Sequence, residues 1–221
     1  MIVVVVPVLA RPWRVAPLAS SLAQAGSSAR LLLVCSPEDE EEIAACRQAG
    51  VDYLVTSWPG GSMGDYARKV NMAYRCSREE WIMLAADDLR FHPGWAEAAL
   101  AAAAATGARV IGTNDLGNPR VTSGRHATHC LVHRSYADQL GTVDGPGAVL
   151  AEAYWHNFVD DELVGTARWR GEWAFAREAV VEHLHPHWGK ASMDATYQLG
   201  LSRFADDRRV YLSRCPRWQC R

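Results

Sequence analysis

The stretch WIMLAADDLRFHPGW, from Trp81 to Trp95, joins a strand-length apolar run to two adjacent carboxylates. Residues 81–84 predict a buried strand, and Asp87 and Asp88 follow its end. Open α/β sheets bind their ligands beyond the carboxyl ends of the strands. Two carboxylates crowded there repel each other unless a cation or hydrogen bonds compensate. Taken alone, the pair predicts either a divalent-metal site or an ordinary turn, because Asp also favours turns.

The composition is that of one globular domain with a substantial core. Of the 221 residues, 49% are hydrophobic and 22% charged, and the net charge of -2 gives no general attraction to nucleic acid or to anionic membranes. The apolar start, Met1 to Ala10, is too short for a membrane span. The six cysteines form no CxxC pair, and there is no signal peptide. We therefore expect a cytoplasmic protein with reduced thiols, in which Cys215 and Cys220 pair only in an oxidising setting.

Three strand–helix alternations open the chain and predict an α/β fold with a mostly parallel sheet and right-handed crossovers. The helix that closes at Gly50 is expected to begin at Ser36 as N-cap, with Pro37 at its first position. The expected elements are strands at 2–6, 31–35 and 51–56 and helices at 12–24 and 37–50. We divide the domain into a nucleotide-sugar-binding half (1–112), an acceptor or catalytic half (113–205) and a C-terminal tail (206–221).

A glycine-rich loop at 60–64 leads into a helix at 65–74. Its backbone N–H groups could hold phosphate, although neither a dinucleotide fingerprint nor a Walker loop is present. Arg68, Lys69 and Asn71 lie on this helix, and they predict either a phosphate contact or a solvated basic face. A strand at 110–112 ends in a second polar cluster, which includes Asn114 and Asp115.

Two further clusters carry candidate chemistry. Asp160, Asp161 and Glu162 open a helix, where acids either favour the helix dipole or supply a general base. His183, His185 and His187 alternate along a strand predicted at 180–184, so the three imidazoles are expected to share one face. Together with Asp194 downstream they indicate a metal neighbourhood.

These segments together resemble the GT-A glycosyltransferases, in particular the family 2-like enzymes. The resemblance rests on VVVVPV at the start, GDYARKVNMAY, LAADDLRFHPGW, VDDEL and EHLHPHWGK, and it spans residues 1 to 200. It implies a single GT-A, Rossmann-like domain with a smaller mixed region on the acceptor side. One feature departs from the family: Ala85 or Ala86 stands where the first Asp of its Asp-x-Asp motif belongs.

The resemblance also implies site roles. A nucleotide diphosphate sugar is expected to transfer its sugar, with inversion, to a hydroxyl of a glycan, protein or small molecule. Mn²⁺ or Mg²⁺ would be held by Asp87 or Asp88 with His185 or, second to it, His183. Asp160 or Asp161, in the cluster with Glu162, would deprotonate the acceptor. The donor contacts expected are Pro7, Arg11, Ser36, Asp39, Arg68, Lys69, Asn71, Asp87, Asn114 and Asp115.

Three other functions fit parts of the pattern. A nucleotidyltransferase of similar fold would need a basic, glycine-rich signature after the first strand, where residues 8–12 read VLARP. A zinc hydrolase would use the three histidines and Asp87, but no HExxH motif is present. A non-catalytic nucleotide- or sugar-binding module is compatible with the incomplete Asp-x-Asp motif.

Overall fold

The β-branched run at the start of the chain forms the middle of the sheet. β1 (Ile2–Pro7) pairs in parallel with β2 (Arg30–Cys35) on one side and with β4 (Trp81–Leu84) on the other. A strand that is paired on both edges and covered on both faces excludes polar side chains, which explains the unbroken Ile and Val residues. Residues 2–6 are accordingly all buried.

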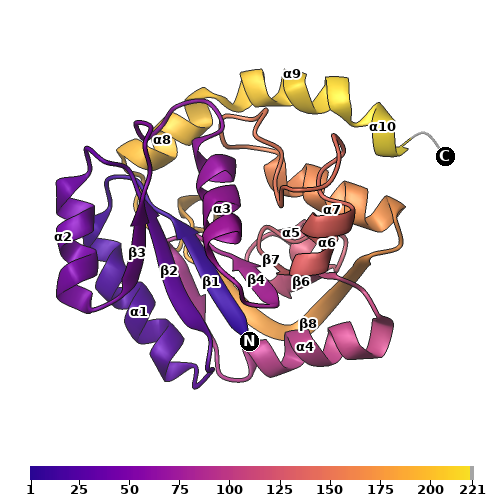
Figure 1. Ribbon diagram of the computed structural model, residues 1–221, viewed down its shortest axis with the longest axis horizontal. Coiled ribbons are helices and arrows are strands. Elements are labelled where there is room, and N and C mark those ends of the chain that lie inside the picture. Colours follow the sequence, from indigo (N-terminus) through magenta and orange to yellow (C-terminus); the bar gives the residue numbers. More distant parts are fainter. Residues whose placement is uncertain (220–221) are drawn as a thin grey trace.

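The remaining strands extend the sheet on both sides. They are β3 (Asp52–Val55), β5 (Leu89–Phe91), β6 (Val110–Asn114), β7 (Cys130–His133) and β8 (Trp173–His183). The computed structural model describes residues 1–219, and within them eight strands lie in the order β3-β2-β1-β4-β7-β6-β8-β5 (Figure 1). All run in one direction except β5 and β7. The carboxyl ends of β1, β4 and β8 therefore open on the same edge, and the α/β, mostly parallel sheet is confirmed.

Helices cover both faces of the sheet. One face carries α1 (Val15–Gln24), α2 (Glu40–Ala49) and α4 (Trp95–Thr106), and the other carries α3 (Asp65–Cys76), α6 (Arg134–Gln139) and α7 (Val159–Trp169). The shorter and C-terminal helices are η1 (Pro12–Arg14), α5 (Pro119–Thr122), η2 (Pro186–Trp188), α8 (Ala195–Ser202), α9 (Phe204–Arg214) and α10 (Pro216–Gln219). Figure 1 shows α8, α9 and α10 running in yellow across one end of the molecule.

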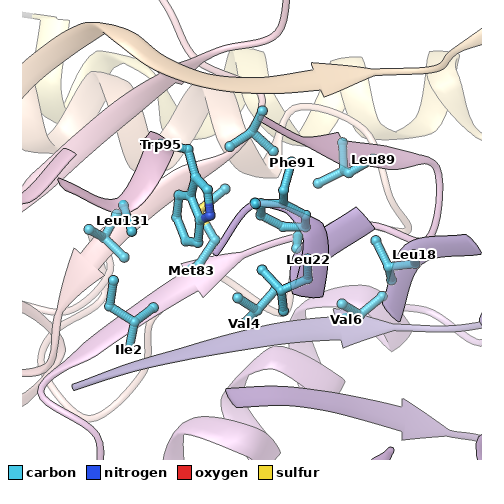
Figure 2. Close-up of a cluster of buried hydrophobic side chains, with 14 of the residues drawn as sticks. Ile2, Val4, Val6, Leu18, Leu22, Met83, Leu89, Phe91, Trp95 and Leu131 are labelled. Carbon is cyan, nitrogen blue, oxygen red and sulfur yellow. The ribbon is translucent and has the colours of Figure 1, made fainter. Parts of the chain in front are cut away.

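Side chains of β1 alternate between the two faces, as successive strand residues must. Val4 and Val6 join the core under α1, α2 and α4, which Figure 2 shows together with the buried indole of Trp95. Val3 and Val5 join the second core, under α3, α6 and α7. The sheet is thus a layer between two apolar cores, and its polar residues gather at the strand ends.

The structure corrects two local predictions. Asp39, not Ser36, caps α2, and its carboxylate accepts the N–H of Glu42. β8 ends at His183, so the alternation argument for three histidines on one strand face is wrong. Pro186 has no N–H to continue a ladder and instead opens η2, which places His185 and His187 beyond the strand.

The segment expected to form a tail packs against the domain as far as residue 219. Asp207 is fully buried and Trp218 nearly so, and Arg214 of α9 pairs with Glu162 of α7. Cys220 lies outside the described residues, so the predicted pairing of Cys215 with Cys220 falls outside them too. In the described part of the chain no helix is long and apolar enough to cross a membrane.

Candidate active site

A cavity of about 510 Å³ opens at the carboxyl edge of the sheet. Its floor is formed by residues at or just beyond the ends of β1, β4 and β8, including Arg11, Asp88 and His183. The start of α7 supplies Asp160 and Asp161 on another wall. Helix α8 and the start of α9 close the cavity from the C-terminal side. The cavity therefore brings together six of the predicted catalytic and metal-binding residues: Asp87, Asp88, Asp160, Asp161, His183 and His185.

Asp88 and His183 form the centre of the floor. The Nε2 atom of His183 lies 3.1 Å from Oδ2 of Asp88, and the Tyr197 hydroxyl donates to the same oxygen over 2.7 Å. Backbone bonds fix this arrangement, because the N–H of His183 donates to the carbonyl of Asp115 and the N–H of Leu184 to that of Asp88. Burial opposes the ionised form of Asp88, but His183 and Tyr197 outweigh it and hold the pKa of Asp88 well below its ordinary value.

Asp87 points to a different partner. Its Oδ1 accepts from the Arg11 guanidinium over 2.9 Å, and the same guanidinium donates to Asp194 over 2.8 Å. Arg11 also lies 3.8 Å above the ring of Tyr197, and only 4% of it is exposed. Burial raises the pKa of Asp87 to about 6, against the lowering effect of Arg11. The two adjacent carboxylates thus have separate cationic or hydrogen-bonding partners, which offset part of their mutual repulsion.

The donor set around Asp88 fits a divalent cation. Oδ1 of Asp88 is buried and has no hydrogen-bond partner among residues 1–219. The ring of His185 lies 5.0 Å from that of His183, and burial lowers the pKa of His185 to about 4, so its imidazole is neutral near pH 7. Carboxylate oxygen with neutral imidazole suits Mn²⁺, and carboxylate oxygen suits Mg²⁺. His187 does not belong to this set: its ring packs on Trp188, and it is absent from the cavity lining that residues 1–219 provide.

The acidic wall is organised by two basic side chains. Oδ2 of Asp160 lies 3.1 Å from Nε2 of His126, and Oδ1 of Asp161 accepts from Arg120 over 2.6 Å. Burial raises the pKa of Asp161, and the neighbouring charge of Asp160 adds to this. The ligand atoms of His126, Asp160 and Asp161 lie within 4.8 Å of one another, close enough to hold a cation. Each carboxylate already has a basic hydrogen-bonding partner, however, so both are satisfied without a cation.

Several residues predicted as donor contacts hold the architecture instead. Lys69 reaches the cavity, but its Nζ is bound by the Val8 carbonyl, Ser36 and Asp65. Asn71 fixes the backbone at 149–150 through three hydrogen bonds. Arg68 stacks 4.1 Å from the Trp58 ring. Of the predicted donor contacts, only Pro7, Arg11, Lys69 and Asp87 line the cavity.

Three more predicted residues serve turns or buried pairs. Asn114 donates to the carbonyl of Arg177 at the β6–β8 irregularity, and Asp115 accepts the N–H groups of Gly117 and Asn118. Glu162 points away from the cavity, where Arg214 and the Tyr154 hydroxyl bind its carboxylate. A buried carboxylate held by an arginine is no longer a free base, so the structure does not bring Glu162 to the reaction site.

Other residues in and directly behind the cavity lining were not predicted from the sequence. Tyr197 and His126 contact the two carboxylate groups, yet the chain places them 109 and 34 positions from their partners. His129 lies between the two groups, and burial lowers its pKa to about 3. Arg120, His126 and His129 lie in one long polar loop, and such loops often carry functional residues. The length and polarity of the loop could therefore have indicated His126 and His129. Nothing in the local sequence singles out Tyr197.

The C-terminal helix α9 holds another part of the wall. Asp207 is fully buried, and its carboxylate accepts the backbone N–H groups of Trp155, His156 and Asn157 over 2.6–3.0 Å. Phe158, which follows, adopts a positive φ of 65° that a bulky side chain rarely takes. The turn therefore depends on Asp207, and it delivers Asp160 to the cavity at the first turn of α7.

Comparison with known proteins identifies the architecture. No family model and no curated protein matches the sequence. Solved structures do match: glucosyl-3-phosphoglycerate synthase from Mycobacterium tuberculosis in complex with Mg²⁺ and UDP superposes with a TM-score of 0.64 at 14% identity, covering 97% of this chain and 79% of that one. The same enzyme with Mn²⁺, UDP-glucose and phosphoglyceric acid gives 0.60 at 13% identity, with 97% and 79% covered. A mycobacterial protein gives 0.65 at 14% identity, covering 97% and 74%. The chain has the fold of the GT-A glycosyltransferases, as its sequence motifs predict.

Proposed function

We propose that the protein is a metal-assisted glycosyltransferase that moves a sugar from a nucleotide diphosphate sugar to an acceptor hydroxyl. The observation that carries this proposal is the opposition, across one cavity, of the Asp88–His183 pair and the Asp160–Asp161 pair. Transfer needs a cation to neutralise the leaving diphosphate and a base for the acceptor; the first pair would hold the cation and the second would supply the base. The likeness to a UDP-glucose-binding structure supports the same class.

The residues have distinct roles in this proposal. Asp88 with His183, and His185 beside them, would hold Mn²⁺ or Mg²⁺, which when bound neutralises charge on the leaving diphosphate. Arg11 offers a buried positive charge next to that position. Tyr66 and Trp155 line the cavity between the two pairs and offer faces on which a sugar can pack. Asp160 or Asp161 would accept the proton of the acceptor hydroxyl, and a single displacement would invert the anomeric carbon.

A donor panel tests the class of reaction. Purified protein with Mn²⁺ is incubated with UDP-, GDP- and TDP-sugars, and release of the nucleoside diphosphate is measured with and without small hydroxyl acceptors, including phosphoglyceric acid. We expect turnover with at least one donor and loss of it with EDTA. Proton NMR of the product then reports the anomeric configuration. Thermal shift with each donor and metal separates a binding module, which shifts without turnover, from an enzyme. The absence of both turnover and thermal shift with every donor would refute the proposal.

The nucleotidyltransferase alternative predicts a different product. Such an enzyme would consume a nucleoside triphosphate and release pyrophosphate, so a triphosphate panel with a pyrophosphate assay distinguishes it. The turn after β1 offers no support for it, because residues 8–12 are not glycine-rich and contribute one basic side chain, Arg11, already paired with Asp87 and Asp194.

A further inference from the structure

We propose that His126 is a positioning residue that selects Asp160, and not its neighbour Asp161, as the proton acceptor of the transfer. The inference rests on the proposed glycosyltransferase function and deepens it by assigning one base. His126 lies on the loop between α5 and β7, is 2% exposed and is not itself part of the cavity lining that the described residues form. It acts on the substrate side only through Asp160.

The geometry separates the two carboxylates. Asp160 and Asp161 both line the cavity, with 26% and 14% of their side chains exposed. His126 holds Asp160 from behind through Nε2 at 3.1 Å and leaves its carboxylate on the cavity surface. Arg120 holds Asp161 from the cavity side at 2.6 Å, since Arg120 itself lines the cavity. Because Arg120 already binds Asp161 on the cavity side, that carboxylate is less available to an acceptor hydroxyl than the Asp160 carboxylate.

The surroundings keep Asp160 ionised, whereas burial raises the pKa of Asp161. The charged or titratable groups around the pair, from every element packed against it, are Asp161, Arg120, His129, Tyr66, His156 and Cys130. Burial opposes the ionised form of Asp160, but His126 outweighs it and lowers the pKa of Asp160 below its ordinary value. In turn Asp160 raises the pKa of His126 against the effect of burial. The pair therefore keeps Asp160 ionised and ready to accept a proton at neutral pH.

The step balances without another reactant. The acceptor O–H bond breaks and its proton passes to the Asp160 carboxylate. The acceptor oxygen uses the freed electron pair to bond to the anomeric carbon of the donor. The bond from that carbon to the diphosphate oxygen breaks, and its electron pair leaves with the nucleoside diphosphate. Asp160 later returns the proton to solvent through the open cavity.

Two substitutions at His126 test the role. His126→Gln retains an N–H near the Nε2 position and cannot titrate, whereas His126→Leu removes the donor and keeps much of the volume. We expect His126→Leu to lower kcat about tenfold to hundredfold with donor KM nearly unchanged, and to move the acid limb of the kcat–pH profile to higher pH. His126→Gln is expected to restore most of kcat. His92→Leu, which removes a 3.3 Å histidine–carboxylate pair outside the cavity, is the matched control.

The readouts distinguish the possible failures. If the wild-type protein turns over donor and folded His126→Leu matches its kcat and pH limb, the inference is overturned and the proposed function stands. If the wild-type protein turns over no donor, both fall. NMR titration measures the pKa of the His126 imidazole without any need for turnover. It therefore tests the pairing even if His126→Leu does not fold. Asp160→Asn should lower the pKa of His126, and an unchanged value would overturn the pairing.

Discussion

The hydroxyl of Tyr197 donates a 2.7 Å hydrogen bond to Oδ2 of Asp88, so a residue of α8 occupies the carboxylate at the centre of the floor. His183 faces the same oxygen, and the other oxygen, Oδ1, has no partner in the described chain. A cation that binds Oδ2 would compete with the Tyr197 hydroxyl for that oxygen, whereas Oδ1 has no partner in the described chain. The C-terminal part of the chain therefore limits how fully Asp88 can bind a metal.

Removing that hydroxyl should strengthen metal binding. Tyr197→Phe keeps the ring under Arg11 but frees Asp88, and a lost hydrogen bond to a carboxylate corresponds to about 1–2 kcal/mol. We expect Mn²⁺ affinity, measured by isothermal titration calorimetry, to rise roughly fivefold to thirtyfold. Tyr53→Phe, at a surface pair with Arg47, should leave it unchanged. Weaker Mn²⁺ binding by Tyr197→Phe would mean that the hydroxyl helps to hold the ion.

The adjacent carboxylates should behave differently from each other. Asp88→Asn removes the charge that His183 faces, and we expect it to abolish Mn²⁺-dependent UDP binding in calorimetry. Asp87→Asn leaves the floor oxygen of Asp88 in place but weakens the 2.9 Å pair with Arg11. We expect it to retain metal binding while the affinity for UDP falls less than tenfold. Equal effects of the two substitutions would contradict the separate roles.

Glu42 should make stability depend on pH. It is fully buried under Arg11, with one carboxylate oxygen unpaired in the described chain, and burial raises its pKa from 4.5 to about 7. Between pH 4.5 and 7 the folded protein binds more protons at Glu42 than the unfolded chain, so the free energy of unfolding falls as pH rises. Glu42→Gln removes this loss of stability, which a pKa shift from 4.5 to about 7 puts at roughly 3 kcal/mol at pH 8.

Urea denaturation at pH 5, 6, 7 and 8 checks this expectation. The difference between Glu42→Gln and the wild-type protein should grow with pH and level off above pH 7. Glu41→Gln, an exposed change on the same helix, is the control and should show a constant difference. If the free energy of unfolding of the wild-type protein falls with pH no faster than that of Glu42→Gln, ionisation of Glu42 does not destabilise the folded protein.

Asp207 should be the most sensitive position of the C-terminal helices. Asp207→Ala leaves three backbone N–H groups of the 155–157 turn without their buried acceptor. We expect a loss of about 3 kcal/mol and a fall in Tm of about 6–12 °C, measured by calorimetry. Asp206→Ala, whose carboxylate pairs with Arg209 on the surface, should change stability by less than about 0.5 kcal/mol. If Asp207→Ala and Asp206→Ala lose similar amounts of stability, Asp207 does not hold the 155–157 turn in place.

The sequence predicts the sheet well because periodicity and turn chemistry are local signals. The run at 2–6, the strand at 81–84 and the acids at 160–162 are recognisable within ten residues. The site is harder to predict, because its contacts join distant parts of the chain. Asp88 meets His183 across 95 positions and Tyr197 across 109, and no spacing in the sequence encodes either approach.

Polar residues at strand ends gave the least reliable signals. Asn114 and Asp115 lie at the end of β6 much as Asp87 and Asp88 lie beyond the end of β4, yet they stabilise turns. Glu162 shares a helix turn with Asp160, but the 3.6-residue period turns it toward Arg214. Which carboxylate faces a cavity and which faces a buried arginine is decided by packing, and local sequence does not report it.

The bond from Asp207 to the 155–157 turn also sets an order of events during synthesis. Domains generally begin to fold from the N-terminus while the ribosome is still extending the chain. The parallel half, β1 to β4, can assemble once residue 84 has emerged, whereas the wall that presents Asp160 must wait for residue 207. A nascent chain would therefore hold strands β1 to β4 in place well before the wall that presents Asp160.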